Sequence, residues 1–166
     1  KRIRWFGIDR KKKQQGIWKN DVHEVGYKYQ MTDIAATMGC DSLNEFNKII
    51  NHRKKIYNTY LQGLSHNKKI QCIHEKSKKK SHGAWLFTIL AENKDYLQKK
   101  LREHFIETNQ VHFRNDRYSI FKKFVKGKKF PNMDYLENRY LVLPLHHKVS
   151  VNDAKYICKL INKYSK

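Results

Sequence analysis

The sequence is poor in cysteine and proline and has no long apolar run. Its three cysteines, Cys40, Cys72 and Cys158, are widely spaced and form no C-x-x-C pair, so neither a disulfide framework nor a zinc site is predicted. No segment approaches the roughly 18 consecutive apolar residues of a membrane span, and no apolar stretch near Lys1 resembles a secretory signal. These absences favour a cytoplasmic protein without membrane contact.

Motifs of common enzyme classes are also missing. The chain has no glycine-rich phosphate loop, no H-E-x-x-H and no G-x-S-x-G, which argues against P-loop enzymes, zinc proteases and serine hydrolases. Its nine histidines are scattered, and the adjacent pair His146 and His147 would face opposite sides of an extended chain. No metal site is therefore predicted.

Acidic residues are scarce, since 15 Asp and Glu stand against 36 Lys and Arg, for a formal net charge of +21. Such a charge is typical of proteins with a polyanionic partner, which makes a basic nucleic-acid-binding protein one hypothesis. The lysine clusters Lys11–Lys13, Lys76–Lys80 and Lys122–Lys129 fall in predicted loops without interleaved aromatic residues. A solvated, lysine-biased surface is the favoured interpretation, and nucleic-acid binding is not expected.

Aromatic residues are plentiful, with ten Tyr, eight Phe and three Trp, and they predict a folded chain. Thr32 is expected to cap a short helix that ends at Gly39. Ser42 and Glu45 form an S-x-x-E capping box, which predicts the start of a long helix with apolar residues at helical spacing as far as Leu64.

The remainder predicts a small layered domain of short strands and helices. Strands are expected at residues 70–73, 85–90, 110–113 and 140–144, a helix at residues 93–104 and a mobile basic loop at residues 122–129. Ser150 should cap a final helix whose apolar face includes Ala154, Ile157, Cys158 and Ile161.

Residues 26–36, GYKYQMTDIAA, resemble the G-Y-N-Y-R-M-T-D-I-x-A-A signature of DegT-type sugar-nucleotide aminotransferases. The resemblance continues in chain order. Residues 4–10 (RWFGIDR) resemble the segment that follows the cofactor-lysine loop of that family, residues 111–113 resemble its V-H-Y element, and residues 143–146 resemble its L-P-L-H element. It covers nearly the whole chain, and the collinear order is more specific than any one motif.

The resemblance implies an α/β fold, namely the small C-terminal domain of a fold type I aminotransferase preceded by the end of its large domain and a long bridging helix. The implied parts are residues 1–41, 42–64 and 65–166. The family uses pyridoxal phosphate on a Schiff-base lysine, which is expected upstream of Lys1, so no catalytic residue is expected here and the chain alone should be inactive. The implied partners are a keto-sugar nucleotide, an amino donor such as glutamate, and a second subunit in a homodimer with shared active sites.

Two positions depart from the signature. Lys28 replaces an asparagine that in many members reaches the cofactor phosphate across the dimer, and a lysine can bind phosphate as a point charge. Gln30 replaces an arginine, so an ionic role there is lost. Two interpretations of Tyr27 and Tyr29 have equal weight, namely packing at a subunit contact and ligand binding. Tyr29 is the candidate for substrate binding.

The segment after the V-H-Y-like element concentrates charged and amide side chains. Arg114 and Arg117 are candidates to bind phosphate oxygens, and Asn115 and Asp116 to bind sugar hydroxyls. His112 joins them as a candidate substrate contact. The alternative is a surface network of arginine and aspartate, and the second hypothesis for the whole chain is a non-catalytic, aminotransferase-like module.

Overall fold

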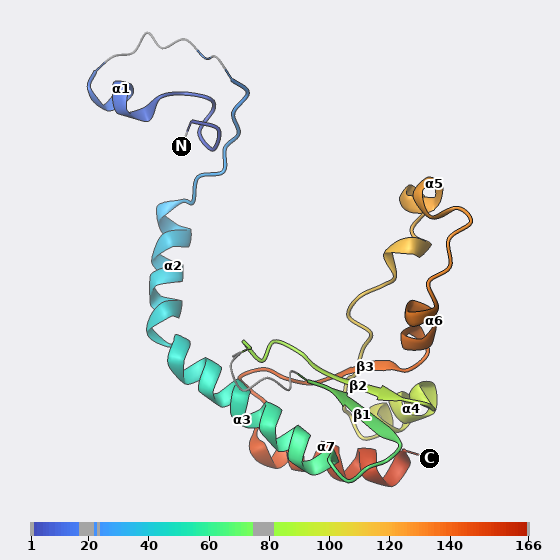
Figure 1. The fold of residues 1–166 in the computed structure, drawn as a ribbon. Helices are drawn as coiled ribbons and strands as arrows, with labels where there is room; N and C mark the ends of the chain where they lie inside the picture. The colour runs from blue at the N-terminus through green and yellow to red at the C-terminus, as the bar shows by residue number, and fades with distance from the viewer. Residues whose placement is uncertain (1, 17–21, 23, 75–81, 166) are drawn as a thin grey trace. The chain divides into compact units, whose positions relative to one another are not determined.

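The structure is a computed structural model that describes residues 2–16, 22, 24–74 and 82–165. It contains two compact units, Lys1–Phe46 and Asn47–Lys166. Each unit is described by itself (Figure 1). The domain boundaries expected after residues 41 and 64 concern a complete enzyme and stay a prediction.

In the first unit, the segment around Gly7 crosses closely over the segment around Gly26. Helix α1 (Arg10–Gln14) lies between these two segments in sequence. A Cβ placed on Gly26 would lie 1.8 Å from the main-chain nitrogen of Gly7, and one placed on Gly7 would lie 2.4 Å from the carbonyl oxygen of Glu24. Gly7 also has a φ of +73°, a conformation that favours glycine. Both positions therefore require glycine.

Helix α2 (Asp33–Asn44) has the predicted N-cap, because the Thr32 side chain accepts a hydrogen bond from the main chain of Ala35 at 3.2 Å. Its predicted end at Gly39 is wrong. The helix continues through Gly39 to Asn44, with Glu45 as its C-cap, and helix α3 (Phe46–Leu64) begins directly afterwards. The long helix therefore starts later than expected.

The predicted capping box at Ser42 and Glu45 is also wrong, because Ser42 lies inside α2. Its hydroxyl donates a hydrogen bond of 2.8 Å to the carbonyl oxygen of Met38, one turn earlier. A serine inside a helix commonly satisfies its hydroxyl in this way, so the S-x-x-E pattern alone does not define a helix start.

The second unit is built on a three-stranded antiparallel sheet in the order β1 (Ile70–Ile73), β2 (Phe87–Ala91), β3 (Tyr140–Leu143). In the register, Cys72 pairs with Ile89, and Ile89 pairs with Leu141. Helices α3, α4 (Lys94–Glu103) and α7 (Val151–Tyr164) pack on one face of the sheet (Figure 1). Helices and strands are thus mixed in this unit, as expected for an α/β fold.

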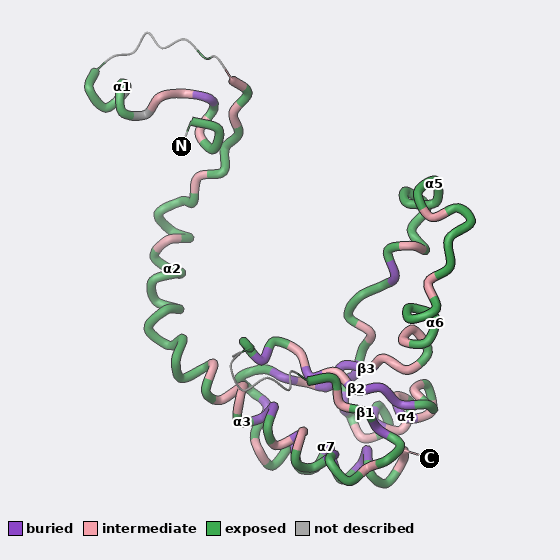
Figure 2. Tube along the Cα trace, viewed as in Figure 1, coloured by how far each residue is buried: buried purple, intermediate pink, exposed green. Residues whose placement is uncertain are grey.

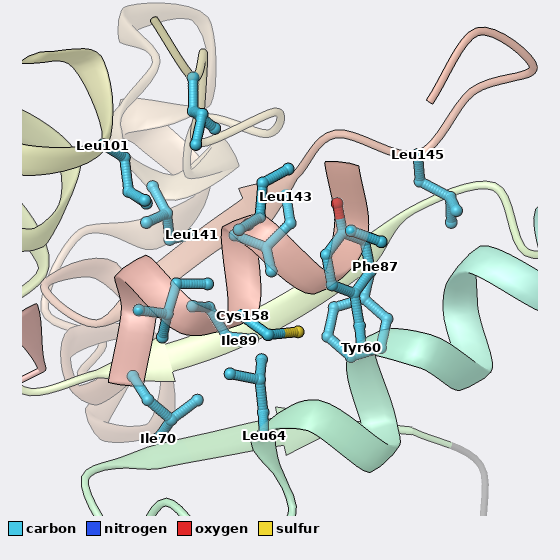
Figure 3. Packing of buried hydrophobic residues seen from close by; sticks show 14 of the residues in the cluster. Tyr60, Leu64, Ile70, Phe87, Ile89, Leu101, Leu141, Leu143, Leu145 and Cys158 are labelled. Atoms are coloured by element: carbon cyan, nitrogen blue, oxygen red, sulfur yellow. The ribbon is translucent and has the colours of Figure 1, made fainter. Parts of the chain in front are cut away.

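The core lies between that sheet face and the helices (Figure 3). Alternate strand residues point inward, and α3 and α7 add large side chains from below the sheet. The fully buried side chains include Tyr60, Leu64, Phe87, Ile89, Leu101, Leu141, Leu143 and Ile161. The Tyr60 hydroxyl donates a hydrogen bond of 2.9 Å to the carbonyl oxygen of Pro144, which ties α3 to the L-P-L-H-like segment.

Helices α3 and α7 pack closely where Gly63 faces Cys158. A Cβ on Gly63 would lie 2.6 Å from the Cys158 Sγ and 2.9 Å from its Cβ. The Asn162 side chain donates a hydrogen bond of 3.0 Å to the Gly63 carbonyl oxygen at the same contact. The absence of a side chain at Gly63 allows this spacing.

The ends of α4 and α7 are well defined. Ser150 and Asp153 form a reciprocal capping box, which confirms the predicted start of α7. Phe105 follows α4 in the left-handed region with a φ of +61°, and its side chain is 99% exposed. The amide of Ile106 donates a hydrogen bond to the Leu101 carbonyl oxygen, so this helix ends in a turn where glycine is usual.

Several strand and loop predictions need correction. The second strand begins at Phe87 rather than residue 85, and residues 110–113 form no strand, because the only pairing there is an isolated bridge between Asn109 and Val142. The segment expected as a basic loop at residues 122–129 contains helix α5 (Lys122–Val125). Residues 76–80 lie outside the described residues.

The segment from residue 114 to residue 137 projects from the sheet and is largely exposed (Figures 1 and 2). It comprises two short 3-10 turns, η1 (Asn115–Arg117) and η2 (Ser119–Phe121), then α5, then α6 (Pro131–Glu137). We call residues 118–130 the basic arm. Phe121, Phe124 and Phe130 alternate with lysines along it, so the expectation that this cluster lacks interleaved aromatic residues is wrong.

Candidate functional site

In the first unit, Lys28 lies on a short ribbon formed with residues 3–6. The amide of Tyr27 donates to the carbonyl oxygen of Ile3 at 2.6 Å, and the amide of Tyr29 donates to that of Arg4 at 2.9 Å. Lys28 itself bridges to Trp5. These bonds fix the main chain of Lys28 and leave its side chain exposed.

The two tyrosines beside Lys28 stack on each other, with ring centroids 5.0 Å apart and planes 13° from parallel. Both are exposed. Since alternate residues of an extended segment face the same side, Tyr27 and Tyr29 share one face of the ribbon and Lys28 lies on the other. A role for Tyr29 in substrate binding and one for Lys28 in phosphate binding would therefore use opposite faces.

In the second unit, a cleft of about 700 Å³ opens between η1 and the basic arm. Its lining includes four of the predicted substrate residues, namely His112, Arg114, Asn115 and Asp116. Arg117 lies outside the lining and donates a short hydrogen bond to Glu137 on α6. These four residues thus share one cleft, and their role in substrate binding stays a prediction.

The other walls of the cleft are apolar and were not predicted from the sequence. They come from Tyr118, Phe121, Phe124, Val125, Phe130 and Met133. The sequence did contain a sign of this wall, because aromatic residues recur every third position at 118, 121 and 124. On consecutive short turns this spacing places their side chains near one another.

Arg114 is the most constrained side chain in the cleft. It is 5% exposed, and its guanidinium donates two hydrogen bonds to Asp116, at 3.0 and 2.7 Å, and further bonds to Asp134 and Glu137. The hydrogen bonds that Arg114 donates to Asp116 and Asp134 raise the pKa of Arg114, and the bonds to Asp116 hold the pKa of that carboxyl below its usual range. The favourable charge pairing offsets the desolvation of these groups.

These contacts support the alternative interpretation of Arg114. Its N–H groups already meet three carboxylates, so binding a phosphate would require breaking internal ion pairs. Arg114 instead connects η1 to α6 and holds the base of the projecting segment. Asp116 is engaged in the same network, which leaves His112 and Asn115 as the exposed ones among the four predicted residues at the cleft.

His112 lies beside an exposed tryptophan, with its ring centroid 6.1 Å from that of Trp85 in an edge-on arrangement. A second cleft, of about 640 Å³, lies against α7 and is lined by His104, Phe105, His146, Lys148 and Tyr156, among others. It contains none of the predicted site residues. Within the described residues, no cluster of three or more His, Cys, Asp or Glu side chains is arranged to hold a metal ion.

The chain has the fold of one part of a pyridoxal-phosphate aminotransferase of fold type I, as two solved structures show. Sugar aminotransferase CalS13 from Micromonospora echinospora aligns over 98% of this chain and 43% of its own, with a TM-score of 0.88 at 19% identity. Helicobacter pylori PseC, an aminotransferase of pseudoaminic acid biosynthesis, aligns over 99% of this chain and 44% of its own, with a TM-score of 0.81 at 17% identity.

The family model described as the DegT/DnrJ/EryC1/StrS aminotransferase family matches residues 1–162. The chain belongs to this family, whose members depend on pyridoxal phosphate. It is 30% identical over 162 residues to UDP-4-amino-4,6-dideoxy-N-acetyl-beta-L-altrosamine transaminase of Campylobacter jejuni, a match that covers 95% of this chain. It is 29% identical over 143 residues to GDP-perosamine synthase of Escherichia coli O157:H7, covering 84% of this chain.

The chain spans 42% of the length of the Campylobacter relative and 38% of that of the Escherichia relative. The match therefore concerns one part of an enzyme. Among the described residues, no helix combines the length and the apolar character that crossing a membrane requires.

Proposed function

We propose that the complete protein is a pyridoxal-phosphate-dependent aminotransferase that transfers an amino group from an amino acid, such as glutamate, to a keto-sugar nucleotide. The collinear family match over residues 1–162 carries this proposal. It is supported by the two named relatives, whose names refer to a UDP-linked amino sugar and to GDP-perosamine. Homodimerisation and a cytoplasmic location belong to the same proposal.

Lys28 is proposed to hold the phosphate group of the cofactor. The fit is favourable because the main chain of Lys28 is fixed by its bridge to Trp5, while its ammonium group is free to extend from the ribbon. Pyridoxal phosphate, when bound, supplies the electron sink that amino transfer requires. By analogy with the family asparagine, Lys28 is proposed to reach the cofactor of the neighbouring subunit.

The cleft beside η1 is proposed to receive the sugar nucleotide. His112 and Asn115 offer an imidazole and an amide at its mouth, and these groups can donate to or accept from sugar hydroxyls. Arg117, about half exposed, is available to a phosphate if it exchanges its bond to Glu137. Arg114 and Asp116 act as positioning residues that hold η1 against α6.

Substitution of Lys28 tests the cofactor assignment. Loss of one charge-assisted hydrogen bond costs on the order of 1.5–3 kcal/mol, so Lys28→Ala should weaken retention of pyridoxal phosphate about ten- to a hundredfold. Retention is measured by cofactor fluorescence after equilibrium dialysis of the complete protein. Lys28→Asn, which restores the family residue, should keep binding close to the original, and Lys55→Ala on the exposed face of α3 is the control.

Mixed dimers test the shared site. A Lys28→Ala subunit combined with a subunit that lacks the cofactor lysine should regain about one working site per dimer, because both defects then fall in one site. If mixed dimers stay inactive while each parent dimer binds its ligands normally, Lys28 is a solvated residue and the assignment is wrong.

A further inference from the structure

We infer that the basic arm and its cleft form a subsite for a nucleoside diphosphate, with the base held between aromatic side chains and the phosphates bound by the lysines of the arm. This inference rests on the proposed function and assigns the parts of the substrate to particular residues. The cleft offers mostly rings and methyl-bearing side chains on the side away from η1. Such walls suit a flat base, because each base presents a π-face that stacks on aromatic rings.

Lysines directly flank the residues that line these walls. Lys122 and Lys123 stand between Phe121 and Phe124, while Lys126, Lys128 and Lys129 stand between Val125 and Phe130. All five are exposed, and within the described residues none of them takes part in an ion pair with a carboxylate. No acidic residue occurs between Asp116 and Asp134, so the arm presents an uncompensated positive charge beside an apolar cleft.

The lysines of α7 do not combine these features in the same way. The lysines of α7 are exposed, but they alternate with an apolar face that is buried in the core. Lys123 also lies 4.9 Å from the ring centroid of Phe124, so a cation and a cleft wall are already in contact. A ligand that carries both a ring and negative charge matches this arrangement better than either feature alone.

The size of the cleft favours one nucleotide over an extended nucleic acid. A volume of about 700 Å³ is typical of a pocket for a single small ligand. Single-stranded nucleic acid instead needs a continuous basic groove with successive stacking rings. Asn115 lines the same cleft and, as proposed above, can bond a sugar hydroxyl, which adds a contact that a non-selective stacking platform would not need.

Calorimetric titration of the complete protein with UDP and GDP tests the inference, with uridine and pyrophosphate as partial probes. Phe124 is 59% exposed, so its replacement should leave the fold intact. Phe124→Ala should weaken UDP binding roughly five- to a hundredfold, the range expected for loss of one base-stacking ring, and leave pyrophosphate binding unchanged. Lys122→Gln combined with Lys123→Gln should weaken UDP and pyrophosphate by about tenfold or more and leave uridine unchanged.

The matched control is Lys155→Gln combined with Lys159→Gln, two exposed lysines of α7, which should change none of these affinities. Equal UDP binding by Phe124→Ala and the original protein overturns the inference, as does an oligonucleotide that binds more tightly than UDP at physiological salt. Amino transfer to a keto-sugar nucleotide is assayed separately. If the complete protein transfers the amino group and Phe124→Ala binds UDP as well as the original, only this subsite is refuted. If UDP binding depends on the basic arm but no amino transfer occurs, only the proposed function is refuted.

Discussion

Replacing Gly63 by alanine should destabilise the second unit, although the same change usually stabilises a helix. Alanine is favoured over glycine by up to about 1 kcal/mol in a helix interior. Here the added methyl would lie 2.6 Å from the Cys158 Sγ, which is closer than unbonded atoms approach. Overpacking of this kind costs about 1–3 kcal/mol. The net loss should be about 0.5–2 kcal/mol, because α3 and α7 must move apart within a filled core.

Urea unfolding followed by circular dichroism measures this loss as a lower midpoint with an unchanged slope. Gly39→Ala is the control, since Gly39 lies inside α2 and a Cβ there meets nothing within 4 Å. That change should raise helix content. Cys158→Ala should relieve part of the Gly63→Ala loss, because it removes the sulfur but keeps the Cβ at 2.9 Å. Additive effects of the two changes, or a Gly63→Ala protein as stable as the original, would refute the close contact.

Three further results are expected. Phe105→Gly should raise stability by about 1 kcal/mol in thermal melts, because it relieves a left-handed backbone at an exposed side chain, while Phe105→Ala should not. Burial raises the pKa of Cys158 to about 11, so the free energy of unfolding should fall as the pH rises from 9 to 11, and it should fall less in Cys158→Ala. Iodoacetamide should label the exposed Cys40 before the buried Cys158. Arg114 lowers the pKa of Asp116, so this pair stabilises the fold above the ordinary carboxyl pKa range, and the stabilisation is lost on acidification. In acid titrations, Arg114→Met should therefore show a weaker dependence of stability on pH.

Features set by a few neighbouring residues were predictable from the sequence. Thr32 and Ser150 cap their helices as expected because each bond joins residues only three positions apart. The capping box at Ser42 failed although its pattern is equally good, since α2 continues through Gly39 and includes Ser42. Local patterns identify possible caps, and the competing helix decides which of them is used.

Features that depend on distant residues were not predictable in the same way. Residues 110–113 have the composition of a strand, yet the pairing partner β3 meets the chain only at Asn109. Arg114 looked like a phosphate ligand because the sequence does not show that Asp134 and Glu137 return to it from α6. His112, Asn115 and Asp116 line the cleft, and their role in substrate binding stays a prediction, whereas the aromatic wall of the cleft was missed.

The contact between Gly7 and Gly26 has a consequence for how this region can change in evolution and in design. The crossing itself excludes any side chain, so both glycines must be kept together. The cost of closing a loop grows only with the logarithm of its length, by about 0.6 kcal/mol for each doubling. A Cβ on Gly16, in the connection between the two glycines, would meet nothing within 4 Å. An insertion beside Gly16 should therefore cost little energy, which makes it a suitable place for a tag or a reporter that leaves the ribbon carrying Lys28 undisturbed.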